Sequence, residues 1–259
     1  MRPRVERKIV DLSNIEQQVA DDNSKPSNSD KPVLLGILAV VFVILVGGYL
    51  FSSKSSPPAS ISLKPYDGPP RTTDATPTKN PDVQKVSFSI FTKTGTPPSE
   101  VVMEIHKSWS PNGAKQFLTL VQNRFFKDAK FFRVVPKFMA QFGIAADPAV
   151  QEKFRVNIPD DPIKPELHNT RGVITFAQTS APNTRSTQLF INFGDNSFLD
   201  AQHFTPIGKV VSGMDVVDAI NDEYREQPDQ GKIQSEGNKY LDQEFPRLSY
   251  IVQANMVYD

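Results

Sequence analysis

Apolar and polar residues alternate over many short segments between residue 83 and the C-terminus. In VQKVSFSIF, residues 83–91, Val86, Phe88 and Ile90 fall on one side, as they do in a half-buried β-strand. SEVVMEIH has a second alternation near Val102. The same reasoning predicts strands at 83–91, 99–106, 131–135, 138–142, 172–178, 187–193, 206–211 and 248–257.

Helical spacing occurs in two places. In the segment 110–126, Ala114, Phe117, Leu118 and Val121 follow the i, i+3, i+4, i+7 pattern, and Ser110-Pro111 is a typical helix start. In the segment 213–222, the three residues spaced for one helix face are Met214, Val217 and Ile220. Residues 144–170 are rich in loop-forming residues. Many short strands with two isolated helices predict a mainly β domain, an antiparallel barrel or sandwich.

A different pattern precedes this domain. Residues 33–51, VLLGILAVVFVILVGGYLF, contain no charge and are apolar on every side of a helix. A bilayer core of about 30 Å needs roughly 20 such residues. We therefore predict a single transmembrane helix over 32–52, of the signal-anchor type. A secretory signal peptide is the alternative, but the run lies far from the N-terminus and lacks a small-residue cleavage site.

The charges near this span bear on its orientation. Lysines lie at similar distances on both sides of it, but a basic group at the extreme N-terminus, Arg2, Arg4, Arg7 and Lys8, favours a cytosolic N-terminus. The later domain would then be luminal or extracytoplasmic. The polar residues 1–31 are expected to form a flexible tail, and the Pro- and Ser-rich residues 53–82 an extended stem. Residues 83–259 remain as the folded domain.

Composition excludes several kinds of chemistry. Lys plus Arg and Asp plus Glu both number 29, so no net field attracts nucleic acid. The absence of cysteine excludes disulfides, thiolate metal sites and cysteine nucleophiles. The three histidines, His106, His168 and His203, are not at metal-ligand spacing. We expect no metal and no cofactor.

A charged residue in an apolar segment is the first sign of a site. FFRVVPKFMAQFG, residues 131–143, carries Arg133 and Gln141 among aromatic and aliphatic residues. An unpaired guanidinium in a core is unfavourable. Arg133 therefore either lines an apolar groove or forms a structural ion pair with an acid such as Asp128 or Glu152.

Three segments together resemble the cyclophilin family of peptidyl-prolyl isomerases. They are FFRVVPKFMAQFG, FAQTSAPNTRSTQLFINF (176–193) and SFLDAQHFTPIGKVVSGMDVVDAI (197–220), and the resemblance runs in order over 84–259. It is greatest for longer members of the family with a C-terminal extension, here DQGKIQSEGNKYLDQEFPRLSYI. The resemblance implies a closed antiparallel eight-stranded β-barrel capped by two α-helices. It also implies a monomeric catalytic domain that acts on proline-containing segments of client proteins and assists their folding.

The resemblance also implies a set of site residues. Arg133 would be catalytic, and the substrate groove would be formed by Phe138, Met139, Gln141, Ala177, Gln178, Gln188, Phe190, Leu199 and His203. Within it, the proline ring would enter an apolar slot of Phe138, Met139, Phe190 and Leu199, with His203 at the rim. Gln141 would hydrogen-bond the substrate backbone, and Gln178 would act through its main chain.

The chemistry of the reaction is consistent with a lone cation. Rotation about the Xaa–Pro amide faces a barrier of about 20 kcal/mol because it breaks amide resonance. No leaving group is involved, so neither a nucleophile nor a metal is required. A fixed guanidinium beside the prolyl group would stabilise the twisted amide more than either planar isomer.

The chain departs from the family pattern at several positions. Phe132 replaces a common histidine, Phe142 replaces the first of two glycines, and Phe198 replaces a tryptophan associated with cyclosporin binding. Thr179 and Ser180 replace small residues beside the groove. These departures leave a second hypothesis open, in which the domain binds proline-containing segments with little turnover.

Overall fold

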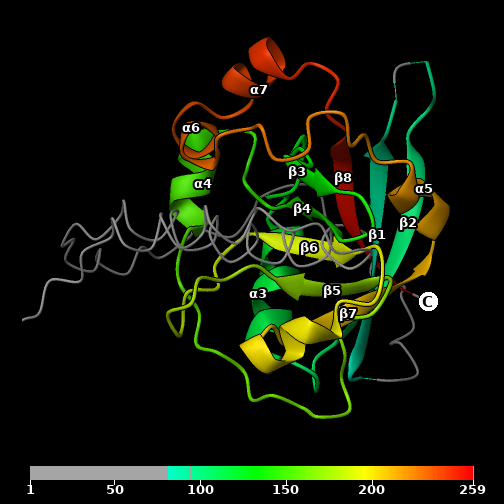
Figure 1. The fold of residues 1–259 in the computed structure, drawn as a ribbon, viewed down its shortest axis with the longest axis vertical. Helices are drawn as coiled ribbons and strands as arrows, with labels where there is room; N and C mark the ends of the chain where they lie inside the picture. Colours follow the sequence, from blue (N-terminus) through cyan, green and yellow to red (C-terminus); the bar gives the residue numbers. More distant parts are fainter. Residues whose placement is uncertain (1–80, 94, 259) are drawn as a thin grey trace, which may run out of the picture. The chain divides into compact units, whose positions relative to one another are not determined.

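The fold is given by a computed structural model, which describes residues 81–93 and 95–258 (Figure 1). The predicted tail, the predicted membrane span and all but the last two residues of the predicted stem lie outside these ranges. Within them, no helix has the length and apolar character needed to cross a bilayer.

Eight strands form one antiparallel sheet in the order β3-β4-β6-β5-β7-β2-β1-β8. The strands are β1 Val83–Phe91, β2 Ser99–His106, β3 Arg133–Val135, β4 Met139–Phe142, β5 Val173–Phe176, β6 Leu189–Asn192, β7 Pro206–Ser212 and β8 Tyr250–Val257. The prediction of a mainly β fold with eight antiparallel strands is confirmed.

The sheet curves so that its two end strands approach each other. The residues just before β3 meet the start of β8: the Asp128 amide donates to the Ile251 carbonyl (2.8 Å) and the Phe131 amide to the Ser249 carbonyl (3.0 Å). Lys130 and Tyr250 form an isolated bridge. Over the described residues, β3 and β8 are not paired as neighbouring strands, and the residues before β3 make the contacts between the two edges of the sheet. The predicted closed barrel is therefore observed only as a strongly curved, eight-stranded half-barrel.

The main core lies between the sheet and helix α3, Pro111–Gln122. Val86, Phe88 and Ile90 of β1 are fully buried, as their alternation predicts. On β2 the buried residues are Val101, Met103 and Ile105, so the inward face is offset by one position from Val102. Phe117 of α3 stacks on Phe88 with ring centroids 6.0 Å apart.

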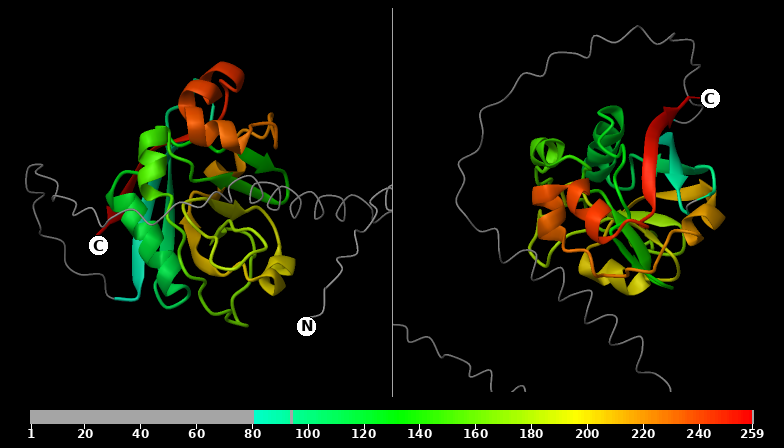
Figure 2. Two further views of the ribbon diagram at one scale, coloured as in Figure 1. Left: turned by 90° about the vertical axis from the view of Figure 1, so that its left-hand side faces the viewer. Right: turned by 90° about the horizontal axis from the view of Figure 1, so that it is seen from above.

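The expectation of two helices is too low for the described part of the chain. Beside α3 and the short α5 (Met214–Asp218), the chain forms α4 (Pro148–Phe154), α6 (Gln230–Glu236), α7 (Asn238–Glu244) and a 3₁₀-helix, η1 (Ser197–Gln202). Helix α6 lies beside α4, and α7 follows it directly (Figure 2). Ile233, Tyr240 and Leu241 of these two helices form a second apolar cluster with Phe132.

Candidate active site

Arg133 lies in a row of residues that crosses three neighbouring strands. It is directly opposite Gln141 of β4, and Gln141 is directly opposite Phe190 of β6. Successive residues of a strand point to opposite faces. Since Val134 and Ala140 in the adjacent row belong to the main core, the row of Arg133, Gln141 and Phe190 faces away from that core.

The guanidinium of Arg133 has two side-chain partners. Its Nε donates a hydrogen bond to Oε1 of Glu226 (2.7 Å), and its Nη2 lies 2.5 Å from the same oxygen. Its Nη1 donates to Oε1 of Gln141 (3.2 Å). Nε2 of Gln141 then donates to Oε1 of Gln188 (2.8 Å). Four side chains thus form a continuous polar chain, Glu226–Arg133–Gln141–Gln188.

Burial and the Glu226 carboxylate act on Arg133 in opposite directions. Burial lowers the pKa of Arg133, whose exposed fraction is 4%, and the charge and hydrogen bond of Glu226 offset only part of this lowering. Arginine in proteins stays protonated. The site therefore holds a permanent cation whose charge is offset by a carboxylate.

This geometry corrects the sequence-based interpretation of Arg133. The two alternatives were a groove-lining arginine and an arginine paired with Asp128 or Glu152. Arg133 shares a face with Phe190, but it is also ion-paired, and its partner is Glu226. Asp128 pairs with Lys127, and Glu152 with Arg155.

A separate apolar cluster lies around Phe190, which we call the Phe190 cluster. Its buried members are Met139, Phe190, Leu199 and Phe204, and the partly buried residues packed against them are Val135, Phe138, Ala177 and Phe198. Phe138 stacks on Phe198 (6.0 Å between centroids), and Phe190 meets Phe204 edge-on (5.9 Å). The structure therefore brings together five predicted groove residues: Phe138, Met139, Ala177, Phe190 and Leu199.

The remaining predicted residues lie around this cluster. Gln188 accepts the Ala177 amide through its main-chain carbonyl (2.9 Å) and Gln141 through its side chain. The Gln178 side chain donates to the carbonyl of Gln202 (3.0 Å), which ties the end of β5 to η1. His203 is exposed at the end of η1, with a left-handed backbone (φ 66°), and is not part of the apolar cluster.

Sequence reasoning missed two residues of this region. Phe204 directly follows His203 inside the matched segment 197–220, so its aromatic side chain was an available signal. Glu226 lies in the polar stretch 221–239, to which no site was assigned. No feature of the neighbouring sequence distinguishes this carboxylate from the other charged residues of its segment. Its contact with Arg133 depends on the path of the chain between α5 and α6.

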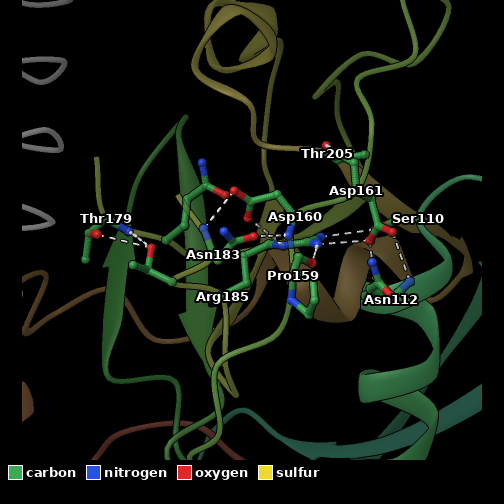
Figure 3. A network of polar contacts seen from close by, with 12 residues as sticks. Ser110, Asn112, Pro159, Asp160, Asp161, Thr179, Asn183, Arg185 and Thr205 are labelled. Carbon is green, nitrogen blue, oxygen red and sulfur yellow. Dashed lines mark hydrogen bonds and ion pairs between the residues drawn. The ribbon is translucent and has the colours of Figure 1, made fainter. Parts of the chain in front are cut away.

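The segment that carries Gln188 is held by a buried polar network (Figure 3). The Asp161 carboxylate accepts the amides of Asn112 and Gly113 (both 3.0 Å) and the Ser110 hydroxyl, and so caps the N-terminus of α3. Nη2 of Arg185 donates to the same carboxylate (3.0 Å). Each of these two charged side chains has an exposed fraction of 1%. Residues 144–166, whose contacts the sequence did not place, are thus linked to both α3 and the 179–188 segment.

Two departures from the family pattern have structural explanations. Phe132 precedes Arg133 in the chain and packs with Ile144 and Ile233 in the second apolar cluster. Phe142 lies in the main core, edge-on to Phe88 at 5.9 Å between centroids. Both side chains therefore belong to packing clusters other than the Phe190 cluster.

A cavity of about 870 Å³ lies elsewhere in the domain, lined by residues such as Phe91, Lys130, Ile220, Arg247 and Tyr250. It contains none of the predicted groove residues, so we do not identify it with the predicted site. The described ranges also contain no group of three or more histidine, aspartate or glutamate side chains arranged to hold a metal.

Comparison with known proteins relates this chain to one family of isomerases. The family model described as "Cyclophilin type peptidyl-prolyl cis-trans isomerase/CLD" matches residues 86–238. A peptidyl-prolyl cis-trans isomerase of Acinetobacter baylyi is 38% identical over 128 residues, 46% of this chain and 65% of that protein. Peptidyl-prolyl cis-trans isomerase B of Escherichia coli is 30% identical over 166 residues, 60% of this chain and 92% of that protein.

A solved structure supports the fold. The cyclophilin-type isomerase cgd2_1660 of Cryptosporidium parvum superposes with a TM-score of 0.50 at 21% identity, over 68% of this chain and 99% of that one. The chain spans just under two thirds of the A. baylyi protein, 65% of its length. The extent of the family match and the coverage of the E. coli relative place the sequence in one family. The chain belongs to the cyclophilin-type peptidyl-prolyl cis-trans isomerases.

Proposed function

We propose that this protein catalyses cis–trans isomerisation of Xaa–Pro bonds in client polypeptides and so assists their folding, with residues 83–259 as the catalytic domain. The observation that carries the proposal is the position of Arg133, which shares a face of the sheet with Phe190 and its apolar cluster and is separated from Phe190 by the single strand β4. The names of the bacterial relatives support it. The C. parvum protein was also solved in the presence of the dipeptide Ala-Pro.

In the proposed mechanism, the apolar cluster binds the proline ring and Arg133 acts on the prolyl amide. Burying the ring contributes roughly 1–2 kcal/mol by area. As the amide twists, its nitrogen loses resonance and regains a lone pair, and the guanidinium stabilises this form. The remaining groove residues, Gln141, Ala177, Gln178, Gln188 and His203, contact the flanking peptide. No covalent intermediate, cofactor or metal takes part.

The test is catalysed exchange of a short Ala-Pro peptide by the full chain in a mild detergent. We expect exchange much faster than the spontaneous process, in which a single event takes tens to hundreds of seconds. NMR exchange spectroscopy measures both isomers directly. An exchange rate equal to that of the peptide alone would contradict the proposal.

A second function, peptide binding with little turnover, is favoured by one observation. Arg133 is almost covered and already paired with Glu226, which leaves little of its surface for a substrate. This hypothesis expects saturable binding of proline peptides without accelerated exchange. It also expects that binding survives Arg133→Lys, so titration calorimetry beside the exchange assay separates the two functions.

We further propose that residues 32–52 form a transmembrane helix, with the N-terminus cytosolic and the catalytic domain extracytoplasmic. The uncharged run 33–51 and the basic residues near the N-terminus support this topology. Protease added to the cytosolic face of sealed membranes is expected to spare the domain. Digestion of the domain from that face would reverse the orientation.

A further inference from the structure

The loop between α5 and α6 brings a carboxylate to Arg133. The Val134 amide donates to the carbonyl of Arg225 (3.0 Å), so this loop runs beside β3 and is fixed there by a backbone bond. Tyr224, one residue earlier, packs edge-on to Phe245 (5.2 Å between centroids). Two contacts immediately before Glu226 therefore hold it next to Arg133.

The contact with Glu226 is the strongest interaction that Arg133 makes with a described residue. Gln141 accepts a hydrogen bond at 3.2 Å as a neutral group, whereas Glu226 accepts one from Nε at 2.7 Å as a charged group. The same Glu226 oxygen lies 2.5 Å from Nη2 as an ion-pair contact. Hydrogen bonds between charged groups are roughly twice as strong as neutral ones. An arginine buried to this degree also requires a charged partner. Glu226 therefore determines the plane and direction of the guanidinium.

A substrate would not displace this carboxylate. The groups that an Xaa–Pro segment offers to Arg133 are a neutral carbonyl and the prolyl nitrogen. A hydrogen bond to a neutral acceptor would contribute less free energy than breaking the charged pair would cost. The Arg133–Glu226 pair is therefore expected to persist through turnover. Its effect is then to orient Arg133 and not to inhibit it.

We propose that Glu226 is a positioning residue for the isomerase reaction, which fixes Arg133 in the orientation that the twisted amide requires. This inference rests on the proposed function. It assigns a role to the segment 221–229, which connects the family's barrel to the C-terminal helices α6 and α7.

The experiment compares Glu226→Ala and Glu226→Gln with the same changes at Glu223. Glu223 is a matched control, because it lies on the same loop and is also paired with an arginine, Arg247, but on the exposed surface. We expect Glu226→Ala to lower kcat/KM about 10- to 100-fold, because a misdirected catalytic group loses this much. The loss should fall on kcat, with KM changed less than about twofold. Glu226→Gln keeps an acceptor for Nε and should recover part of the loss, whereas the Glu223 variants should match wild type.

A double-mutant cycle separates positioning from a merely structural role. If Glu226 acts through Arg133, Glu226→Ala should have no further effect on kcat in the Arg133→Ala background. Circular dichroism melting checks each variant, and Glu226→Gln decides the question if Glu226→Ala does not fold. An unchanged or increased kcat in Glu226→Gln and Glu226→Ala, or additive losses in the cycle, would overturn the inference. If instead wild type and Arg133→Ala are equally inactive, it is the proposed function that fails.

Discussion

Replacing Arg133 by alanine is expected to lower kcat/KM for an Ala-Pro peptide about 10²- to 10³-fold, the loss typical for one preorganised donor. The reason is that Arg133 is the cation of the row that it forms with Gln141 and Phe190, and alanine leaves only the apolar side chains of the Phe190 cluster to act on the substrate. The proline ring should still bind, so KM should change much less than kcat. Exchange NMR at several peptide concentrations measures both quantities.

The control for this change is Arg247→Ala, which also removes an arginine that is paired with a glutamate. Arg247 is exposed and its partner Glu223 is on the surface, so the variant should retain wild-type exchange. Arg133→Lys adds a second comparison, since lysine keeps the charge but not the planar fork that bonds both Glu226 and Gln141. We expect it to recover only part of the activity. Equal kcat/KM for wild type and Arg133→Ala would remove Arg133 from the mechanism.

Much of the fold could be predicted because alternation is a local signal. Val86, Phe88 and Ile90 are fully buried, and β1 and β2 begin and end where the pattern predicts. The grouping of Phe138, Met139, Phe190 and Leu199 could also be predicted, since all four occur in matched motifs and all join one cluster. Local pattern and motif order therefore predicted the strands and the residues that gather in the Phe190 cluster.

The features that could not be predicted from the sequence depend on contacts between distant segments of the chain. Helices α6 and α7 have seven residues each and few apolar positions, so no helical period stands out. Their stability comes from packing on Phe132, which lies about a hundred residues earlier. Glu226 meets Arg133 for the same reason: the loop before α6 is placed by β3 and by Phe245. Sequence reasoning found the cation and could not find its partner.

Replacing Asp161 by asparagine is expected to lower the free energy of unfolding by about 3–5 kcal/mol at neutral pH, the cost of breaking a buried ion pair. The carboxylate caps α3 and pairs with Arg185, and neither side chain is accessible to water. Asparagine keeps the shape but removes the charge that compensates the buried guanidinium. Urea unfolding followed by circular dichroism measures the difference. Asp218→Asn is the matched control, because Asp218 pairs with Arg171 at the surface and should contribute little.

The effect of Asp161→Asn should also depend on pH, in a direction fixed by the pKa of Asp161. Burial raises this pKa, but the hydrogen bonds from Ser110, from the Asn112 and Gly113 amides and from Arg185 together outweigh burial and lower it. A folded-state pKa below the unfolded value of about 3.9 means that the stabilisation is fully present above that pH and is lost as the pH falls through the folded pKa. The difference between wild type and Asp161→Asn should therefore be constant from pH 5 to 7 and shrink on acidification below about pH 4. A difference that stays the same at pH 3 would show that the stabilisation does not come from ionisation of Asp161, and that its charge is not what holds the 179–188 segment and α3 together.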